Sequence, residues 1–270
     1  MQVDGASAIV TGAGQGIGAA LARALAAKGA RVLVSDLSPE KARRIADEIG
    51  GVAHHGDLCD PDVITSMVAL AVARFGKVDM LFSNAGFALG EPDGPTSGTD
   101  AHWQTSWDLH VMAHLRASRL LLPAMIARRS GVLVNIASAA GVLTQIGDAA
   151  YSATKHAAVS LAQSLAIEHG RDGIQVSVVC PLYVATPLLG YDDAPAERPP
   201  GVILPEDVAQ ATLDGIAQGQ FLICPHPEAR TFFAGRATDT DRWIEGMQRL
   251  RDRVSRQTDG TDPASLHRFI

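Results

Sequence analysis

Tyr151 and Lys155 are the two residues of this sequence whose types and spacing are best suited to proton transfer. They are four positions apart in Tyr151-Ser-Ala-Thr-Lys155, so on a helix the phenol and the ammonium share one face, one turn apart. At about 6 Å and an effective dielectric of about 20, the cation favours the phenolate by roughly 3 kcal/mol, or about two pKa units. We therefore expect the pKa of Tyr151 to fall towards the range useful for proton exchange with an alcohol or a carbonyl. Because this spacing is common by chance, the assignment depends on the rest of the chain.

A glycine-rich turn near the N-terminus has the pattern of a phosphate-binding loop. The apolar run Ala6–Thr11 predicts a buried strand, and the composition from about Ile17 to Lys28 predicts a helix. Between them, a strand–turn–helix order would direct backbone N–H groups and a helix N-terminus at a phosphate. The alternative is a plain tight turn. The expected cofactor contacts here are Gly12, Gln15, Gly16, Ile17 and Gly18.

The residue that follows the second predicted strand favours NAD over NADP. Asp36 comes directly after Arg31–Ser35 and 18 residues after Gly18, close to the interval at which an acidic residue meets the adenosine ribose. Its carboxylate would accept ribose hydroxyls and repel a 2′-phosphate. Leu37 offers no positive charge in its place, and Gln15 stands where an arginine would help to hold that phosphate. The alternative is that Asp36 only caps the next helix.

Polar or small residues follow the other predicted strands in the same way. In an open parallel sheet, ligands bind outside the carboxyl ends of the strands, so these residues should gather at one edge. Ser138 follows the strand Gly131–Ala137 and precedes Tyr151 by 13 residues. An acidic residue after the third strand could contact adenine or simply form a turn. The residues after the third and fourth strands are Asp57, Leu58, Asn84, Ala85 and Gly86.

Alternating strands and helices predict an α/β fold with a single doubly wound Rossmann-type domain and a parallel seven-stranded sheet. We expect this domain to span 1–224 and a helical extension, packed on it, to span 225–270 with a break around Thr238–Thr240. A long helix, Trp103–Arg128, should bend at Pro123 or break before it. The loop Phe87–Asp100 and a mobile flap at Leu188–Gly201 should border the substrate, and the tail after Gln257 should be loose.

Composition and charge narrow the function classes. With 270 residues, 47% hydrophobic content and a net charge of −6, the chain is typical of a globular enzyme and offers no basic stripe for nucleic acid. Three dispersed cysteines and a start without a signal peptide indicate the cytoplasm, and no apolar run is long enough to cross a membrane. His110 and His114 are one turn apart but lack a third ligand, so we expect no metal site.

Taken together, these motifs resemble the short-chain dehydrogenase/reductase family in its form of about 250 residues, over about residues 5–224. The resemblance implies a nicotinamide cofactor, Tyr151 as acid/base, Ser138 as the hydroxyl that orients the substrate oxygen, and Lys155 as the cation that lowers the Tyr pKa and binds the nicotinamide ribose. It also places Pro181, Val184 and Thr186 at the cofactor, with Thr186 on the carboxamide.

The sequence departs from the family pattern at four places. His110 stands where the family has an asparagine that supports a water relay to the lysine, so His110 is the expected but altered fourth catalytic residue. Ser83 replaces an asparagine, Leu182 replaces the glycine after Pro181, and the usual glycine-containing ending is replaced by Cys224-Pro-His-Pro and some 45 further residues.

These observations predict an oxidoreductase that transfers hydride between NAD(H) and a small-to-medium, fairly apolar secondary alcohol or ketone. One alternative is an NADP-linked carbonyl reductase of the 3-oxoacyl type. The other is a catalytically weak NAD-binding regulatory protein, which His110 and Leu182 favour. The expected partner is a small molecule, with no nucleic acid or membrane, and the expected assembly is a homodimer or homotetramer.

Overall fold

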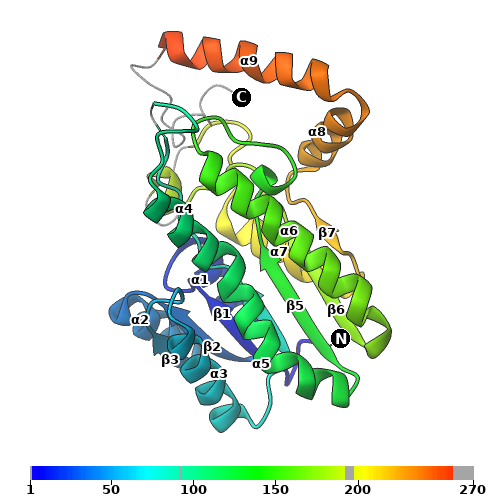
Figure 1. Cartoon of the computed structure of the whole chain (residues 1–270). Helices are drawn as coiled ribbons and strands as arrows, with labels where there is room; N and C mark the ends of the chain where they lie inside the picture. The colour runs from blue at the N-terminus through cyan, green and yellow to red at the C-terminus, as the bar shows by residue number, and fades with distance from the viewer. Residues whose placement is uncertain (1, 92, 192–197, 258–270) are drawn as a thin grey trace.

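The structure is a computed structural model that describes residues 2–91, 93–191 and 198–257. Its centre is one parallel sheet of seven strands in the order β3-β2-β1-β4-β5-β6-β7, which confirms the predicted doubly wound sheet (Figure 1). The strand order reverses between β1 and β4, and that reversal is where an open α/β sheet binds its ligand. The strands are β1 (Ser7–Thr11), β2 (Arg31–Asp36), β3 (Val52–His55), β4 (Met80–Ser83), β5 (Gly131–Ile136), β6 (Ile174–Val179) and β7 (Leu222–Ile223).

Helices cover both faces of the sheet. One face is covered by α1 (Gly16–Ala27), α2 (Pro39–Ile49) and α7 (Pro205–Ala217). The other, turned towards the viewer in Figure 1, is covered by α3 (Pro61–Phe75), α5 (Ala113–Ala127) and α6 (Ala149–His169), with α4 (Asp100–Trp107) leading into α5.

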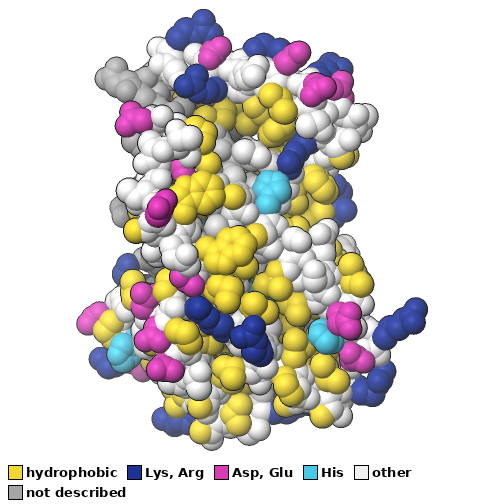
Figure 2. Space-filling view, in the orientation of Figure 1, with side chains coloured by type: hydrophobic (Ala, Val, Ile, Leu, Met, Phe, Trp, Pro, Cys, Tyr) yellow, Lys and Arg dark blue, Asp and Glu magenta, His cyan; other side chains and the backbone are white. Residues whose placement is uncertain are grey.

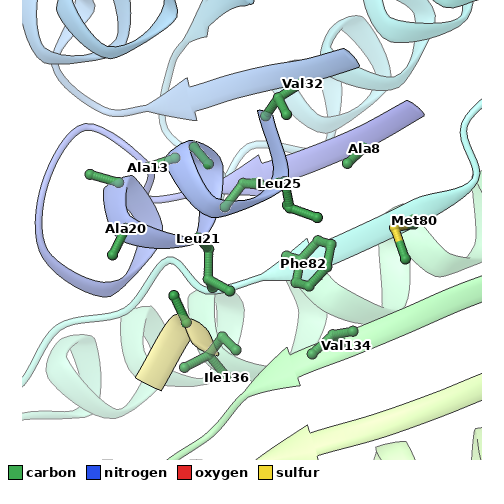
Figure 3. Packing of buried hydrophobic residues seen from close by; sticks show 14 of the residues in the cluster. Ala8, Ala13, Ala20, Leu21, Leu25, Val32, Met80, Phe82, Val134 and Ile136 are labelled. Carbon is green, nitrogen blue, oxygen red and sulfur yellow. The ribbon is translucent and has the colours of Figure 1, made fainter. Parts of the chain in front are cut away.

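Successive side chains of a strand point to opposite faces of the sheet, so the strands contribute to two hydrophobic cores, one on each face of the sheet. Val10 and Phe82 face α1, where Leu21 and Leu25 pack over them. Figure 3 shows this cluster, with the α1 leucines above Phe82 and Ile136. The neighbouring strand residues, such as Ile9 and Leu81, join the core under α3, α5 and α6. Both faces of the strands are thus buried, as their continuous apolar runs predict.

The predicted boundaries differ from the observed ones at strand ends and in one helix. The sequence pattern predicts the fourth strand at Val78–Ser83 and the seventh at Gln220–Cys224, whereas the fourth begins at Met80 and the seventh is only Leu222–Ile223. The long helix is divided not at Pro123, which lies inside α5, but by a π-helical turn at Asp108–Met112. The second of the two predicted possibilities, a break before the proline, is therefore the observed one.

After β7 the chain forms two further helices, α8 (Pro227–Thr238) and α9 (Thr240–Gln257). They meet at the predicted break and lie beyond the carboxyl ends of the strands (Figure 1). Part of the expected flap, 192–197, and the expected loose tail, 258–270, lie outside the described residues. Within the described part of the chain, no helix is both long and apolar enough to span a membrane.

Candidate active site

A cleft of about 830 Å³ opens at the carboxyl ends of the strands. Its walls come from the turns after β1 to β6 and from α6, which is the common edge that the sequence predicts. It brings together seventeen of the nineteen predicted site residues; the two absent from its walls are Gly18 and His110. The seventeen are Gly12, Gln15, Gly16, Ile17, Asp36, Leu37, Asp57, Leu58, Asn84, Ala85, Gly86, Ser138, Tyr151, Lys155, Pro181, Val184 and Thr186.

The turn between β1 and α1 has the shape of a dinucleotide cradle. Gly12 has φ +60°, a conformation that favours glycine, and a Cβ there would lie 2.8 Å from the Cα of Ala85. A Cβ on Gly18 would lie 2.3 Å from the carbonyl oxygen of Gly12, so the absence of a side chain at Gly18 allows the turn to pack tightly against α1. Because neither glycine has a side chain, the N-terminus of α1 is open to the cleft and can face a phosphate. The residues present therefore fit a nicotinamide dinucleotide.

The adenosine end of the cleft contains a positive charge that the sequence analysis missed. Asp36 Oδ2 accepts a hydrogen bond from Gly14 N at 2.8 Å, and Oδ1 accepts one from Ser38 N at 3.0 Å. Beside it, Lys41 lines the cleft and donates to Gln15 Oε1 at 2.5 Å. The sequence analysis considered only Leu37 and Gln15 as sources of positive charge here and did not identify Lys41. Lys41 is the third residue of α2, and only the packing of α2 on the glycine turn brings its side chain here.

Ser138, Tyr151 and Lys155 form one connected group at the other end of the cleft. The Ser138 hydroxyl lies close enough to the Tyr151 phenol to act to lower its pKa. Lys155 Nζ lies 5.5 Å from the centre of the Tyr151 ring and donates to the carbonyl oxygen of Ile136 at 3.1 Å. Tyr151 is 8% exposed and Lys155 is 4% exposed. A phenol, a second hydroxyl and an ammonium are thus held around a position that a substrate oxygen can take.

Burial, rather than the lysine, dominates the acidity of this group in the free protein. It raises the pKa of Tyr151 to about 12, although the Ser138 hydroxyl opposes the shift. Burial also lowers the pKa of Lys155 to about 8. The expectation that the neighbouring ammonium lowers the tyrosine pKa is therefore wrong for the protein alone, because the distance argument omitted the cost of desolvating both groups.

Two carboxylates that the sequence analysis did not single out fix the start of α6. Asp148 is the N-cap, and its Oδ1 accepts from Tyr151 N at 2.9 Å. Glu91, 1% exposed, accepts from Ala149 N at 2.8 Å and from Ala150 N at 3.2 Å. Anionic acceptors at a helix N-terminus satisfy free amides and interact favourably with the helix dipole. The Asp148 cap three residues before Tyr151 was readable in the sequence, whereas Glu91, 58 residues from Ala149, was not.

His110 lies behind the cleft, in the π-helical turn. Its Nδ1 is 2.8 Å from Thr154 Oγ1, whose own proton is directed to the carbonyl oxygen of Ala150 at 2.8 Å. The Nδ1 therefore donates, which leaves Nε2 to accept from Phe87 N at 3.3 Å. Burial lowers the pKa of His110 to about 2, so the ring is neutral. It packs edge-on against the Tyr151 ring at 5.5 Å.

His114 and His110 take separate partners. Asn135 Nδ2 is 2.6 Å from His114 Nδ1, and His114 Nε2 has no hydrogen-bond partner among the described residues. Both histidines and Lys155 line a small cavity of about 20 Å³, which is room for about one water molecule. In the part of the chain that the structure describes, no group of three or more potential metal ligands is found.

Leu182, the departure after Pro181, is held by a residue from the chain's distinctive ending. Its N–H donates to His226 Nδ1 at 3.1 Å, and His226 Nε2 lies 3.1 Å from the carbonyl oxygens of both Tyr183 and Gly201. His226 is 2% exposed and immediately precedes α8. The segment that carries Pro181, Val184 and Thr186 is therefore tied to the base of the C-terminal helices.

Comparison with known proteins agrees with this geometry. The profile of a family described as short chain dehydrogenase matches residues 6–196. Oxidoreductase UcpA of Escherichia coli (strain K12) is 36% identical over 195 residues, 69% of this chain and 72% of that protein. Cyclohexanol dehydrogenase of Acinetobacter sp. (strain SE19) is 34% identical over 212 residues, 75% of this chain and 84% of that protein.

A solved structure extends the likeness to the whole architecture. A short chain dehydrogenase/reductase from Burkholderia phymatum, in complex with NAD, superposes with a TM-score of 0.80 at 26% identity. The match covers 89% of this chain and 96% of that one.

Proposed function

Because this chain belongs to the short chain dehydrogenase family and is an oxidoreductase acting on CH–OH groups, we propose that it transfers hydride between NAD(H) and a secondary alcohol or ketone, with Tyr151 as acid/base. The observation that carries the proposal is that Ser138, Tyr151 and Lys155 lie together in the same cleft as the glycine turn, with Lys155 Nζ 5.5 Å from the centre of the Tyr151 ring. Neither half of this arrangement alone would specify the reaction.

NAD is the proposed cofactor because the residues of the cleft match its parts in order. Gly12, Gly16 and the N-terminus of α1 would hold the pyrophosphate, and Asp36 the adenosine ribose. Asp57 and Leu58 would border the adenine, while Asn84 to Gly86 and Thr186 would border the nicotinamide half. The dehydrogenase from Burkholderia phymatum, whose structure contains NAD, supports this choice. When bound, the nicotinamide supplies the hydride acceptor or donor.

Side chains of the protein transfer the hydroxyl proton of the alcohol. In the direction of oxidation, the Ser138 hydroxyl orients the alcohol oxygen, and Tyr151 Oη removes its proton as hydride leaves the carbon. In the direction of reduction, Tyr151 returns that proton. Since burial sets the tyrosine pKa at about 12, the phenolate needs compensating positive charge. The Lys155 ammonium provides it, and its hydrogen bond to the Ile136 carbonyl oxygen directs it towards the site. His110 is neutral and holds Thr154 and the Phe87 backbone, so we assign it a positioning role.

The substrate is proposed to be small to medium in size and fairly apolar. The walls beside Tyr151 are formed mainly by hydrocarbon side chains, among them Phe87, Leu143, Ile146, Leu182 and Leu189. Cyclohexanol dehydrogenase, a relative by sequence, supports the choice of an uncharged alcohol.

The test is a screen of secondary alcohols and ketones, followed by the absorbance of the reduced nicotinamide with NAD and with NADP. We expect turnover with NAD, and we expect Tyr151→Phe to reduce kcat by about 10²–10⁴-fold while NADH still binds. Near-normal turnover by Tyr151→Phe would exclude the proposed acid/base. NADH binding without turnover of any compound would instead favour the regulatory alternative that His110 and Leu182 suggest.

We also propose that the enzyme works in the cytoplasm as a homodimer or homotetramer. The support for assembly is a set of exposed apolar side chains on neighbouring helices of one face: Trp107 (44% exposed), Leu120 (44%) and Ile167 (82%). The support for the location is three free cysteines, Cys59, Cys180 and Cys224.

A further inference from the structure

The two helices after β7 form part of the cleft that contains Ser138 and Tyr151. The family profile stops at residue 196, yet Phe232 of α8 and Trp243, Met247 and Leu250 of α9 line the same cleft as Ser138 and Tyr151. In Figure 1 these two helices lie across the end of the molecule at which the strands point. The cleft is therefore bounded on one side by residues that lie beyond the family profile.

The sequence of α9 explains how it presents this wall. Trp243, Met247 and Leu250 are spaced by four and three residues and are partly buried, so they form one stripe on a helix. The remaining positions are mostly charged, and Arg249 and Glu245 pair with each other on the outer side. Figure 2 shows these charges along the outer edge, with hydrophobic side chains on the inner side. The helix thus turns an apolar stripe towards the cleft and its charges towards solvent.

Arg236 attaches this pair of helices to the elements that carry the catalytic residues. Its Nη1 donates to the carbonyl oxygen of Val142 at 2.5 Å and to His156 Nε2 at 2.9 Å. His156 directly follows Lys155, and Val142 lies in the segment after Ser138. The guanidinium also lies 5.3 Å from the centre of the Trp243 ring. Together with His226 at the base of α8, Arg236 holds the stripe at the wall of the cleft that contains Tyr151.

The charges around the cleft indicate what this wall accepts. Among the described residues that line it, the charged side chains are Asp36, Lys41, Asp57 and Lys155. The first three lie at the adenosine end, and Lys155 is buried against Tyr151. Among the described residues of the cleft wall, a carboxylate or phosphate on the substrate would meet no cation beside the α9 stripe, and it would lose its hydration without compensation.

We propose that α8 and α9 are a substrate-selecting cap, with Trp243 at its centre, that favours a medium-sized, uncharged alcohol with a bulky hydrocarbon skeleton over a small alcohol or a hydroxy acid. This inference rests on the proposed function and adds the substrate class. Phe232, Met247 and Leu250 complete the apolar surface, and Arg236 positions it. The skeleton would fill the space between Tyr151 and the α9 stripe.

The test compares Trp243→Ala and Met247→Ala with Ile244→Ala, a matched truncation on α9 that is 43% exposed and absent from the cleft walls. With NAD, the substrates are tert-butylcyclohexanol, hydroxycyclohexanecarboxylate and isopropanol. We expect Trp243→Ala to lower kcat/KM for tert-butylcyclohexanol by about tenfold, and to change isopropanol turnover and NADH affinity by less than about twofold. The wild type should prefer the neutral ring to the carboxylate by at least about tenfold. Ile244→Ala should match the wild type.

A binding measurement separates failure of the cap from failure of the reaction. In Tyr151→Phe saturated with NADH, calorimetry with tert-butylcyclohexanone should show about tenfold weaker binding when Trp243→Ala is added, whether or not any alcohol is turned over. Equal affinity with and without Trp243, or preference for the carboxylate, would overturn the cap. Absence of alcohol oxidation by the wild type, with ketone binding still dependent on Trp243, would overturn the proposed reaction alone. Thermal unfolding of each variant, together with the Met247→Ala result, distinguishes a lost contact from a lost fold.

Discussion

Asp36 is the residue on which the choice of cofactor depends. Its carboxylate lies at the end of β2 and is held by two backbone N–H groups, but Lys41 stands beside it. A carboxylate repels a 2′-phosphate and an ammonium attracts one, so the two side chains act in opposite directions. Asp36 accepts a hydrogen bond directly from the backbone of the glycine turn at Gly14 N, whereas Lys41 donates to the side chain of Gln15. For this reason NAD is the proposed cofactor.

Removing the negative charge of Asp36 alone should shift the cofactor preference from NADH towards NADPH. We expect Asp36→Asn, which keeps an acceptor for the turn, to tighten NADPH binding by about tenfold and to weaken NADH binding by a similar factor. Adding Lys41→Ala should reverse most of the gain for NADPH. Fluorescence titration of both reduced cofactors measures this, and tighter binding of NADPH than NADH by the wild type would contradict the assignment.

His114 should make the protein sensitive to acid. Burial lowers its pKa from an ordinary 6.5 to about 4, so below the ordinary value the unfolded chain binds a proton that the folded chain does not. Stability is full above about pH 6.5 and is lost as the pH falls towards 4. Between pH 7 and pH 5 this residue should account for about 2 kcal/mol of the loss in the free energy of unfolding.

Denaturant unfolding at the two pH values checks this expectation. His114→Gln keeps an acceptor for Asn135 and does not titrate, so the pH dependence of its unfolding free energy should be smaller than that of the wild type by about 2 kcal/mol. An unchanged pH dependence would mean that the histidine is not held neutral. His110, whose pKa burial lowers to about 2, should contribute to the remaining dependence in the same direction.

At the scale of elements, the start of α6 decides where Tyr151 lies. Asp148 caps the helix from its own segment, and Glu91 reaches it from the loop after β4. One loop thus joins a wall of the cleft to the helix that carries Tyr151. The π-helical turn also contacts α6, because it places His110 against Thr154 of that helix.

Truncating Glu91 should therefore affect both stability and catalysis. Glu91→Ala removes two hydrogen bonds from a charged acceptor, so we expect a loss of about 2–3 kcal/mol in the free energy of unfolding, and a lower kcat at temperatures where the fold persists. Glu91→Gln, which keeps one acceptor, should lose less. Denaturant titration measures the first effect, and a loss below about 0.5 kcal/mol for Glu91→Ala would show that water replaces the carboxylate there.

At the scale of the whole molecule, one surface remains apolar. Ile167 is 82% exposed on α6, the helix that carries Tyr151. If the enzyme is a homo-oligomer joined through this face, Ile167→Glu should reduce the molecular mass in solution towards that of a single chain, since an unpaired charge at an apolar interface costs binding energy. Light scattering at micromolar concentration measures the mass.

The control is Ala217→Glu on α7, which introduces the same charge at an exposed side chain on the opposite face of the sheet. We expect it to leave the mass unchanged. A wild-type protein that already has the mass of one chain would contradict the assembly. Because the cleft is formed within one chain, we expect any separated subunit to retain NADH binding.

The order of elements and most of the cleft could be predicted from the sequence for local reasons. Alternating apolar runs and amphipathic stretches determine a parallel sheet, and a parallel sheet brings every strand's carboxyl end to one edge. Residues placed directly after strands, such as Gly12, Asp36 and Ser138, therefore had to meet. Tyr151 and Lys155 needed only the period of a helix.

What the tertiary structure decided depends on groups far apart in the chain. Lys41 lies near Asp36 because of how α2 packs, and Glu91 caps a helix 58 residues away. Trp243 lines the same cleft as Tyr151, and Arg236 and His226 hold the last helices there. The pKa of Tyr151 is also a property that the tertiary structure decides. Its neighbour Lys155 was visible in the sequence, but the desolvation that opposes that neighbour arises only when the whole cleft closes around both.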